Sequence, residues 1–352
     1  MINMKMPIWL DQTLDMAIRQ EFAAEKLGEL AGVLAALGLR QSVLRLNEWQ
    51  RNCPELTVVG QQLSLYGLLD LARCNLQLAE QAGIRQVLLL CSAAQQAELG
   101  ASLREILREA DKRGLQISLL VEESSSLTAT VLSDIITSNK KYPVATVFYW
   151  DKAGKGNPFT IFEQISILKS HLACPVGIAA DNTYKMATAN SLAALKAGAE
   201  QVITAIGGIG GHAPWEEIVM VARQIGGIHT ELPPELAGKC RQVFSMLSLP
   251  LAADKAIIGP AIFAHESGLH VDGVSKSPEI YEPFAPELVG LTRQVIVGKH
   301  SGTAALKTKF AAWGIGLEEE ESNRLLSAVR ALAVRKKAAI SDNELRRLYL
   351  SG

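Results

Sequence analysis

Acidic side chains follow directly after several short apolar runs of this sequence. Asp11 follows the run at residues 8–10, Glu122 follows residues 116–121, and Asp181 follows residues 176–180. Carboxylates are preferred ligands of hard divalent cations, so Asp11 and Asp181 are candidate metal ligands. The alternative for Asp11 is a carboxylate that caps the following turn, and the alternative for Asp181 is a solvated acid without a partner.

Two lysines lie just beyond the apolar run at residues 144–149, at positions 152 and 155. Lys152 and Lys155 either hold an anionic ligand or belong to a solvated loop. A different interpretation makes Lys152 the Schiff-base lysine of an aldol- or lyase-type enzyme, which requires a desolvated amine with a lowered pKa. The glycine run at residues 207–211 either cradles a phosphate or forms an ordinary loop.

Eight short apolar runs rich in β-forming residues recur through the first two thirds of the chain. Segments with helical periodicity, such as residues 68–82, separate most of them and predict helices, and several of these segments end at a glycine, as at Gly38, Gly83, Gly114 and Gly198. This alternation predicts a (β/α)8 TIM barrel, whose chemistry lies at the carboxyl ends of the strands. The alternative is an open doubly wound sheet, but no G-x-G-x-x-G follows the first run. The runs are residues 8–10, 42–46, 62–66, 86–91, 116–121, 144–149, 176–180 and 202–206.

The recurring β-rich apolar runs stop before Pro233-Pro234, and mostly helical patterns follow. We therefore predict a barrel at residues 1–235 and a smaller helical region at residues 236–352. A net charge of −1 favours neither nucleic acid nor an anionic membrane as a partner. The five cysteines are scattered and predict neither a disulfide framework nor a zinc site. We expect a cytoplasmic protein, because neither a signal peptide nor a membrane-spanning run is recognisable.

Three segments closely resemble the homocitrate and isopropylmalate synthases, which are TIM-barrel enzymes followed by a helical post-catalytic region. Residues 265–306 contain the blocks H-E-S-G-L-H-V-D-G, Y-E-P-F-A-P and G-K-H-S-G. Residues 182–199, N-T-Y-K-M-A-T-A-N-S-L-A-A-L-K-A-G-A, resemble the helix after the seventh strand of the family's barrel. A weaker match is D-Q-T-L at residues 11–14, where the family has D-T-T-L-R-D-G-E-Q.

The resemblance implies an acyltransferase that condenses acetyl-CoA with a 2-oxo acid held on a divalent cation (Mg2+, Mn2+ or Zn2+) at the barrel mouth. The cation acts as a Lewis acid, while a side chain manages the acetyl protons. The alternative for His265 and His270, which both match the family pattern, is packing between the tail and the barrel. Carried onto this sequence, the family's site becomes Asp11 and Asp181 for the metal, Glu122 and His270 for catalysis, and Asp151, Lys152 and Asn182 for substrate binding.

The sequence departs from the family pattern at several strand ends. Alignment on M-A-T-A-N places Ala179 and Asp181 where the family has its two histidine ligands. Asp15 stands where the family has an arginine, or the arginine lies in a small deletion, and Lys152 replaces a threonine. Loss of the imidazoles and the guanidinium predicts a metal site that is lost or weak, and therefore an impaired or repurposed synthase.

An alternative interpretation keeps the enzyme active, with a metal site rebuilt from Asp11, Glu122, Asp181 and His270. The resemblance also implies a homodimer, or a heterodimer with an active paralogue, since family members interlock through the post-catalytic region. The H-E-S-G-L-H-V-D-G and Y-E-P-F blocks favour the homocitrate synthases of nitrogen fixation. Acetyl-CoA and a 2-oxo acid are the expected small-molecule ligands.

Overall fold

A computed structural model of the chain describes residues 6–52, 55–92, 99–123, 128–138, 143–228, 231–266, 273 and 277–351. The chain divides into two compact units, one of residues 1–233 with 239–250 and one of residues 234–238 with 251–352. The predicted division at 235/236 stays a prediction, although residues 239–250 group with the first unit. Within the described ranges, no helix combines the length and the apolar character needed to cross a bilayer.

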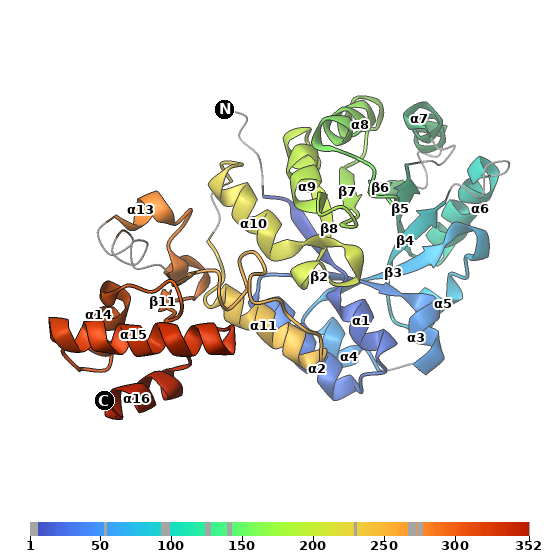
Figure 1. Cartoon of the computed structure of the whole chain (residues 1–352). Coiled ribbons are helices and arrows are strands. Elements are labelled where there is room, and N and C mark those ends of the chain that lie inside the picture. Colours follow the sequence, from blue (N-terminus) through green and yellow to red (C-terminus); the bar gives the residue numbers. More distant parts are fainter. Residues whose placement is uncertain are drawn as a thin grey trace. The chain divides into compact units, whose positions relative to one another are not determined.

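The first unit is a closed parallel barrel, as predicted. Each strand pairs with the next in chain order, and β8 pairs with β1, which excludes the open-sheet alternative (Figure 1). The strands are β1 (Ile8–Asp11), β2 (Gln41–Arg45), β3 (Ser64–Asp70), β4 (Gln86–Cys91), β5 (Gln116–Glu122), β6 (Val144–Asp151), β7 (Val176–Ala180) and β8 (Gln201–Ala205).

Helices connect successive strands and cover the outside of the barrel (Figure 1). A short strand, β9 (Ala213–Pro214), extends the pairing beside β8. The helical segments are α1 (Thr13–Arg19), α2 (Ala24–Ala36), α3 (Leu46–Asn52), α4 (Thr57–Gly60), η1 (Leu71–Arg73), α5 (Gln77–Gln81), α6 (Leu99–Lys112), α7 (Ala129–Ser138), α8 (Pro158–His171), α9 (Ala187–Lys196), η3 (Ile206–Gly211), α10 (Trp215–Gln224) and α11 (Leu236–Met246).

The third strand lies later in the chain than its predicted position at residues 62–66. Leu68 and Leu69 continue β3 because they pair in register with Leu88 and Leu89 of β4. The helix predicted over residues 68–82 is consequently reduced to η1 and α5. Pairing with a neighbouring strand has overridden the helical periodicity of this segment.

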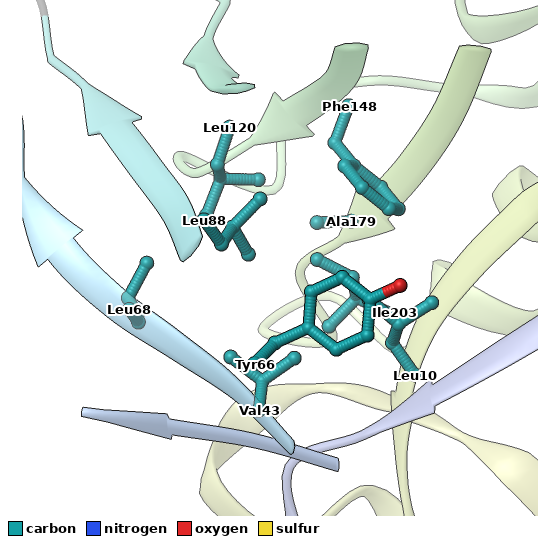
Figure 2. Packing of buried hydrophobic residues seen from close by; sticks show 9 residues of the cluster. All are labelled: Leu10, Val43, Tyr66, Leu68, Leu88, Leu120, Phe148, Ala179 and Ile203. Atoms are coloured by element: carbon teal, nitrogen blue, oxygen red, sulfur yellow. The ribbon is translucent and has the colours of Figure 1, made fainter. Parts of the chain in front are cut away.

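One ring of side chains fills the barrel, with every strand contributing (Figure 2). Its members are Leu10, Val43, Tyr66, Leu68, Leu88, Leu120, Phe148, Ala179 and Ile203. Since side chains alternate between the two faces of a strand, this ring fixes which residues face inward at the carboxyl ends. Leu90 and Trp150, two residues beyond Leu88 and Phe148, pack on the ring as this alternation requires.

The second unit contains helices and a two-stranded parallel pair, β10 (Ala264–His265) and β11 (Gln294–Val295). The predicted helical tail is therefore confirmed, with this small strand pair added. Its helical segments are α13 (Pro278–Tyr281), η4 (Pro286–Val289), α14 (Thr303–Ala311), α15 (Glu319–Lys336) and α16 (Asp342–Leu350). A separate apolar core, including Leu306, Phe310 and Val329, holds it together.

Phe148 is fully buried in the ring, so Phe148→Ala is expected to lower the free energy of unfolding by about 3–5 kcal/mol through lost burial and the cavity left behind. Phe159 on α8 is 82% exposed, and Phe159→Ala serves as the control, with an expected change of about 0.5 kcal/mol or less. Urea unfolding followed by circular dichroism measures both. Equal effects of the two substitutions would contradict the described core.

Candidate functional site

Asp11 closes the turn that follows β1. It is fully buried, and its Oδ2 accepts the amide of Thr13 at 2.9 Å while its Oδ1 accepts the Thr13 hydroxyl at 2.6 Å. The Thr13 hydroxyl oxygen in turn accepts the amide of Ile206 at 2.9 Å. Burial raises the pKa of Asp11 to about 7. Both carboxylate oxygens are engaged at the β1–β8 seam, which favours the turn-capping interpretation over metal ligation.

Asp15 lies one helical turn further on, within α1, where the family pattern has an arginine. Its Oδ1 accepts the backbone amide of Arg45 at 2.8 Å, and its Oδ2 lies 2.8 Å from Nη2 of Arg19 and 3.9 Å from Nε of Arg45. Burial raises the pKa of Asp15, and the neighbouring Arg19 opposes that shift.

The loss of positive charge inferred from the sequence at this position is therefore incomplete. Two guanidinium groups reach Asp15, Arg19 from the end of the same helix, α1, and Arg45 from the end of β2. Sequence reasoning missed both arginines. Arg45 was detectable as the residue at the carboxyl end of the second strand, two positions beyond the inward-facing Val43.

Glu122 and Lys152, predicted separately for catalysis and substrate binding, lie side by side. Lys152 Nζ is 3.2 Å from Glu122 Oε2 and 5.3 Å from the centre of the Trp150 ring. The Lys152 side chain is 49% exposed. The Lys152 amine is half-exposed and paired with a carboxylate, so this geometry opposes the Schiff-base interpretation, which needs a desolvated amine.

Asp151 shapes the loop that carries Lys152. It is 1% exposed, and its Oδ1 accepts the amide of Gly156 at 3.1 Å, while Asn190 donates to the Gly156 carbonyl at 2.8 Å. Its Oδ2 has no hydrogen-bond partner among the described residues. Burial raises the pKa of Asp151. Because Trp150 faces the ring, strand alternation turns Asp151 toward the helices, which favours a positioning role over substrate contact.

Asp181 and Asn182 form a tight turn after β7. Asp181 Oδ1 accepts the amide of Thr183 at 2.7 Å, and the Asn182 amide donates to the Gly211 carbonyl at 2.9 Å. Half-buried His212 follows the glycine run, within electrostatic reach of Asp15 and Asp181. Burial lowers the pKa of His212 to about 4, so the imidazole is neutral at neutral pH. His212 was not singled out from the sequence, although it follows the eighth strand.

The glycine run after β8 adopts left-handed backbone conformations at Gly207, Gly208, Gly210 and Gly211. A side chain at Gly207 is excluded, since its Cβ would lie 2.3 Å from the Phe244 ring. The Gly207 amide donates to Glu216 Oε2 at 2.8 Å, in the first turn of α10. A carboxylate already held at this helix N-terminus opposes the binding of phosphate there.

The residues present do not fit the carboxylate–imidazole metal site implied by the resemblance. Ala179, at the position of one expected histidine, is 6% exposed and belongs to the core ring (Figure 2). In the part of the chain that the structure describes, no three His, Cys, Asp or Glu residues gather as a metal site. His270 lies outside the described residues, and His265 belongs to β10, near Glu282 at 3.8 Å.

The raised pKa of Asp11 predicts a pH dependence of stability. Its folded-state pKa of about 7 exceeds the ordinary 3.8, so the stability contribution is complete below pH 3.8 and is lost as the pH rises toward 7, by roughly 4 kcal/mol at most. Asp11→Asn should therefore flatten the fall in Tm between pH 5 and 8. Asp111→Asn, on the exposed side of α6, is the control. An unchanged slope in Asp11→Asn would contradict the described burial.

Comparison with known proteins places this architecture in a family. Residues 61–236 match the family described as HMGL-like, and residues 257–337 match the homocitrate synthase post-HMGL domain-like family. The chain is 37% identical over 255 residues to 2-isopropylmalate synthase 2 of Caldanaerobacter subterraneus, and 36% identical over 247 residues to homocitrate synthase 1 of a Nostoc species. These matches cover 70% and 69% of this chain, and 66% of each relative's length.

The barrel also resembles solved structures that share little sequence with it. The HMG-CoA lyase of Bacillus subtilis matches with a TM-score of 0.58 at 17% identity, over 71% of this chain and 97% of the lyase. An HMG-CoA lyase from Acinetobacter baumannii, in complex with coenzyme A and 3-methylmalate, matches with a TM-score of 0.57 at 18% identity, over 71% and 95%. These structures support the fold. The family match and the sequence identities given above show that the chain belongs to the HMGL-like family, together with the homocitrate and isopropylmalate synthases.

Proposed function

We propose that this chain has lost the metal-dependent condensation of a homocitrate- or isopropylmalate-type synthase and uses its barrel mouth to bind a small anionic ligand. The single observation that carries the proposal is Ala179. Where the resemblance implies an imidazole, a methyl group is packed into the barrel core at 6% exposure. A methyl group has no electron pair to give a cation, so this position contributes nothing to a Lewis-acid site.

The carboxylates near the mouth do not replace the missing ligands. Asp11 has both oxygens engaged by Thr13, and Asp15 is held by Arg19 and Arg45. Asp181 accepts the amide of Thr183. A hard cation binds tightly only where several oxygen or nitrogen donors converge, and each of these carboxylates is occupied by a different local partner.

Positive side chains at the strand ends support the binding of an anion. Arg45 lies at the end of β2, Arg19 at the end of α1, and Lys152 just after β6. All three side chains are at least one third exposed, at 40%, 36% and 49%. A 2-oxo acid or acetyl-CoA, the ligands implied by the family, carries the negative charge that these groups attract.

The purified chain, assayed with acetyl-CoA, several 2-oxo acids and Mg2+, Mn2+ or Zn2+, should release thiol far more slowly than roughly 1 per second, an ordinary enzymatic turnover. Calorimetry should detect no stoichiometric binding of these cations. An intact isopropylmalate synthase in the same assay is the positive control. Fast thiol release, or 1:1 metal binding that Asp181→Asn abolishes, would overturn the proposal and favour the rebuilt-site alternative.

The proposal extends to partners. We infer that this chain forms a homodimer or pairs with an intact synthase of the nitrogen-fixation type in the cytoplasm, because the post-catalytic region of the family is retained at residues 257–337. Co-expression of the tagged chain with an untagged intact synthase should yield a complex of equal stoichiometry by light scattering. A monomer both alone and in co-expression would contradict this part of the proposal.

A further inference from the structure

We propose that Arg45 and Arg19, oriented by the buried carboxylate of Asp15, form a metal-independent site for the carboxylate group of a small organic acid. This inference rests on the proposed function and names the part of the barrel mouth that binds the ligand. The site is built from the ends of β2 and α1, and α1 packs against both β2 and η3. It does not use the positions that the family resemblance assigns to the metal.

Asp15 organises the two guanidinium groups. Its side chain is only 8% exposed, and its Oδ2 lies 2.8 Å from Arg19 Nη2 and 3.9 Å from Arg45 Nε. Its Oδ1 accepts the backbone amide of Arg45 at 2.8 Å, which fixes the carboxylate against the end of β2. The hydrogen bond from Arg19 orients that side chain, and the ion pair at 3.9 Å keeps the Arg45 guanidinium beside the same carboxylate before a ligand binds.

The local charge leaves room for one further anion. Two guanidinium groups flank the single carboxylate of Asp15, so these three side chains together carry one net positive charge. His212 adds none at neutral pH, because burial lowers its pKa to about 4. A net charge of this size matches a monoanionic carboxylate better than a doubly charged phosphate.

Most of the arginine donors remain accessible. The side chains are 36% exposed for Arg19 and 40% for Arg45. Within the described ranges, the side-chain contacts of each guanidinium are those to Asp15, and a guanidinium has five N–H donors. Its planar fork matches the two oxygens of a carboxylate. The unused donors therefore have the chemistry of a carboxylate-binding site.

Gln12, just beyond β1, is a second polar side chain near these strand ends, and its hydrogen bonding is incomplete. It is 7% exposed, and its Oε1 has no hydrogen-bond partner among the described residues. The register of β1 with β2, Asp11 opposite Ser42, places Gln12 level with Val43, two residues before Arg45. A buried polar atom without a hydrogen-bond partner costs stability, and a polar ligand that reached Gln12 would relieve that cost.

The test titrates the full chain with pyruvate, 2-oxoglutarate, inorganic phosphate and coenzyme A, in buffer containing EDTA and no acetyl-CoA. Calorimetry should detect binding of at least one of the two oxo acids, and Arg45→Gln should weaken it tenfold or more, as expected for a lost charge-assisted contact. Arg51→Gln is the matched control, because Arg51 lies on α3, pairs with Glu48 and is 73% exposed. Its affinity should stay within twofold of the unaltered chain.

Arg45→Lys keeps the charge but loses the planar fork, so its affinity should lie between those of the unaltered chain and Arg45→Gln. If Arg45→Gln does not fold, Arg45→Lys and Arg19→Gln provide the same comparison. Equal binding in all variants, binding of phosphate or coenzyme A alone, or no binding at millimolar concentration would overturn the inference. Condensation activity would instead overturn the proposed function and leave the arginine site standing, because this titration contains neither metal nor acetyl-CoA.

Discussion

Closure of the barrel depends on the seam between β1 and β8. Side-chain hydrogen bonds extend the backbone pairing along this seam. The Asp11 carboxylate accepts the Thr13 hydroxyl, and the oxygen of that hydroxyl accepts the backbone amide of Ile206, just beyond β8. With the seam closed, each strand of the barrel contributes at least one residue to the central ring, from Leu10 of β1 to Ile203 of β8. A buried carboxylate with a raised pKa is the cost of this arrangement, since burial disfavours its charged form.

The ring in turn determines which strand-end residues reach the barrel mouth. Residues two positions beyond a ring member lie on the same face, as Arg45 does after Val43 and Glu122 after Leu120. Residues one position beyond lie on the other face, where Asp11 is found. The same alternation therefore separates Asp11, which serves a turn, from Arg45 and Glu122, whose side chains can meet a ligand, although all three stand at strand ends.

Membership of the family and retention of its chemistry are separate questions in this chain. The matches at residues 61–236 and 257–337, with 36–37% identity to a homocitrate synthase and an isopropylmalate synthase, show that the chain belongs to the HMGL-like family. The proposed loss of condensation depends instead on single positions, above all Ala179. Arg19 and Arg45 bring positive charge to Asp15, the position that the resemblance aligns with an arginine of the family.

The sequence by itself determined the eight-fold alternation, the helical tail and the family, because apolar periodicity, helix-ending glycines and long motif blocks are local in the chain. It also placed Glu122 and Lys152 at strand ends. Only the tertiary structure decided that Thr13 occupies both oxygens of Asp11, that Lys152 pairs with Glu122, and that Arg19 and Arg45 converge on Asp15. Lys152 and Glu122, like Arg45 and Asp15, are 30 positions apart, and the burial of Asp11 and Asp15 depends on the folded barrel, so no local pattern of residue types records these outcomes.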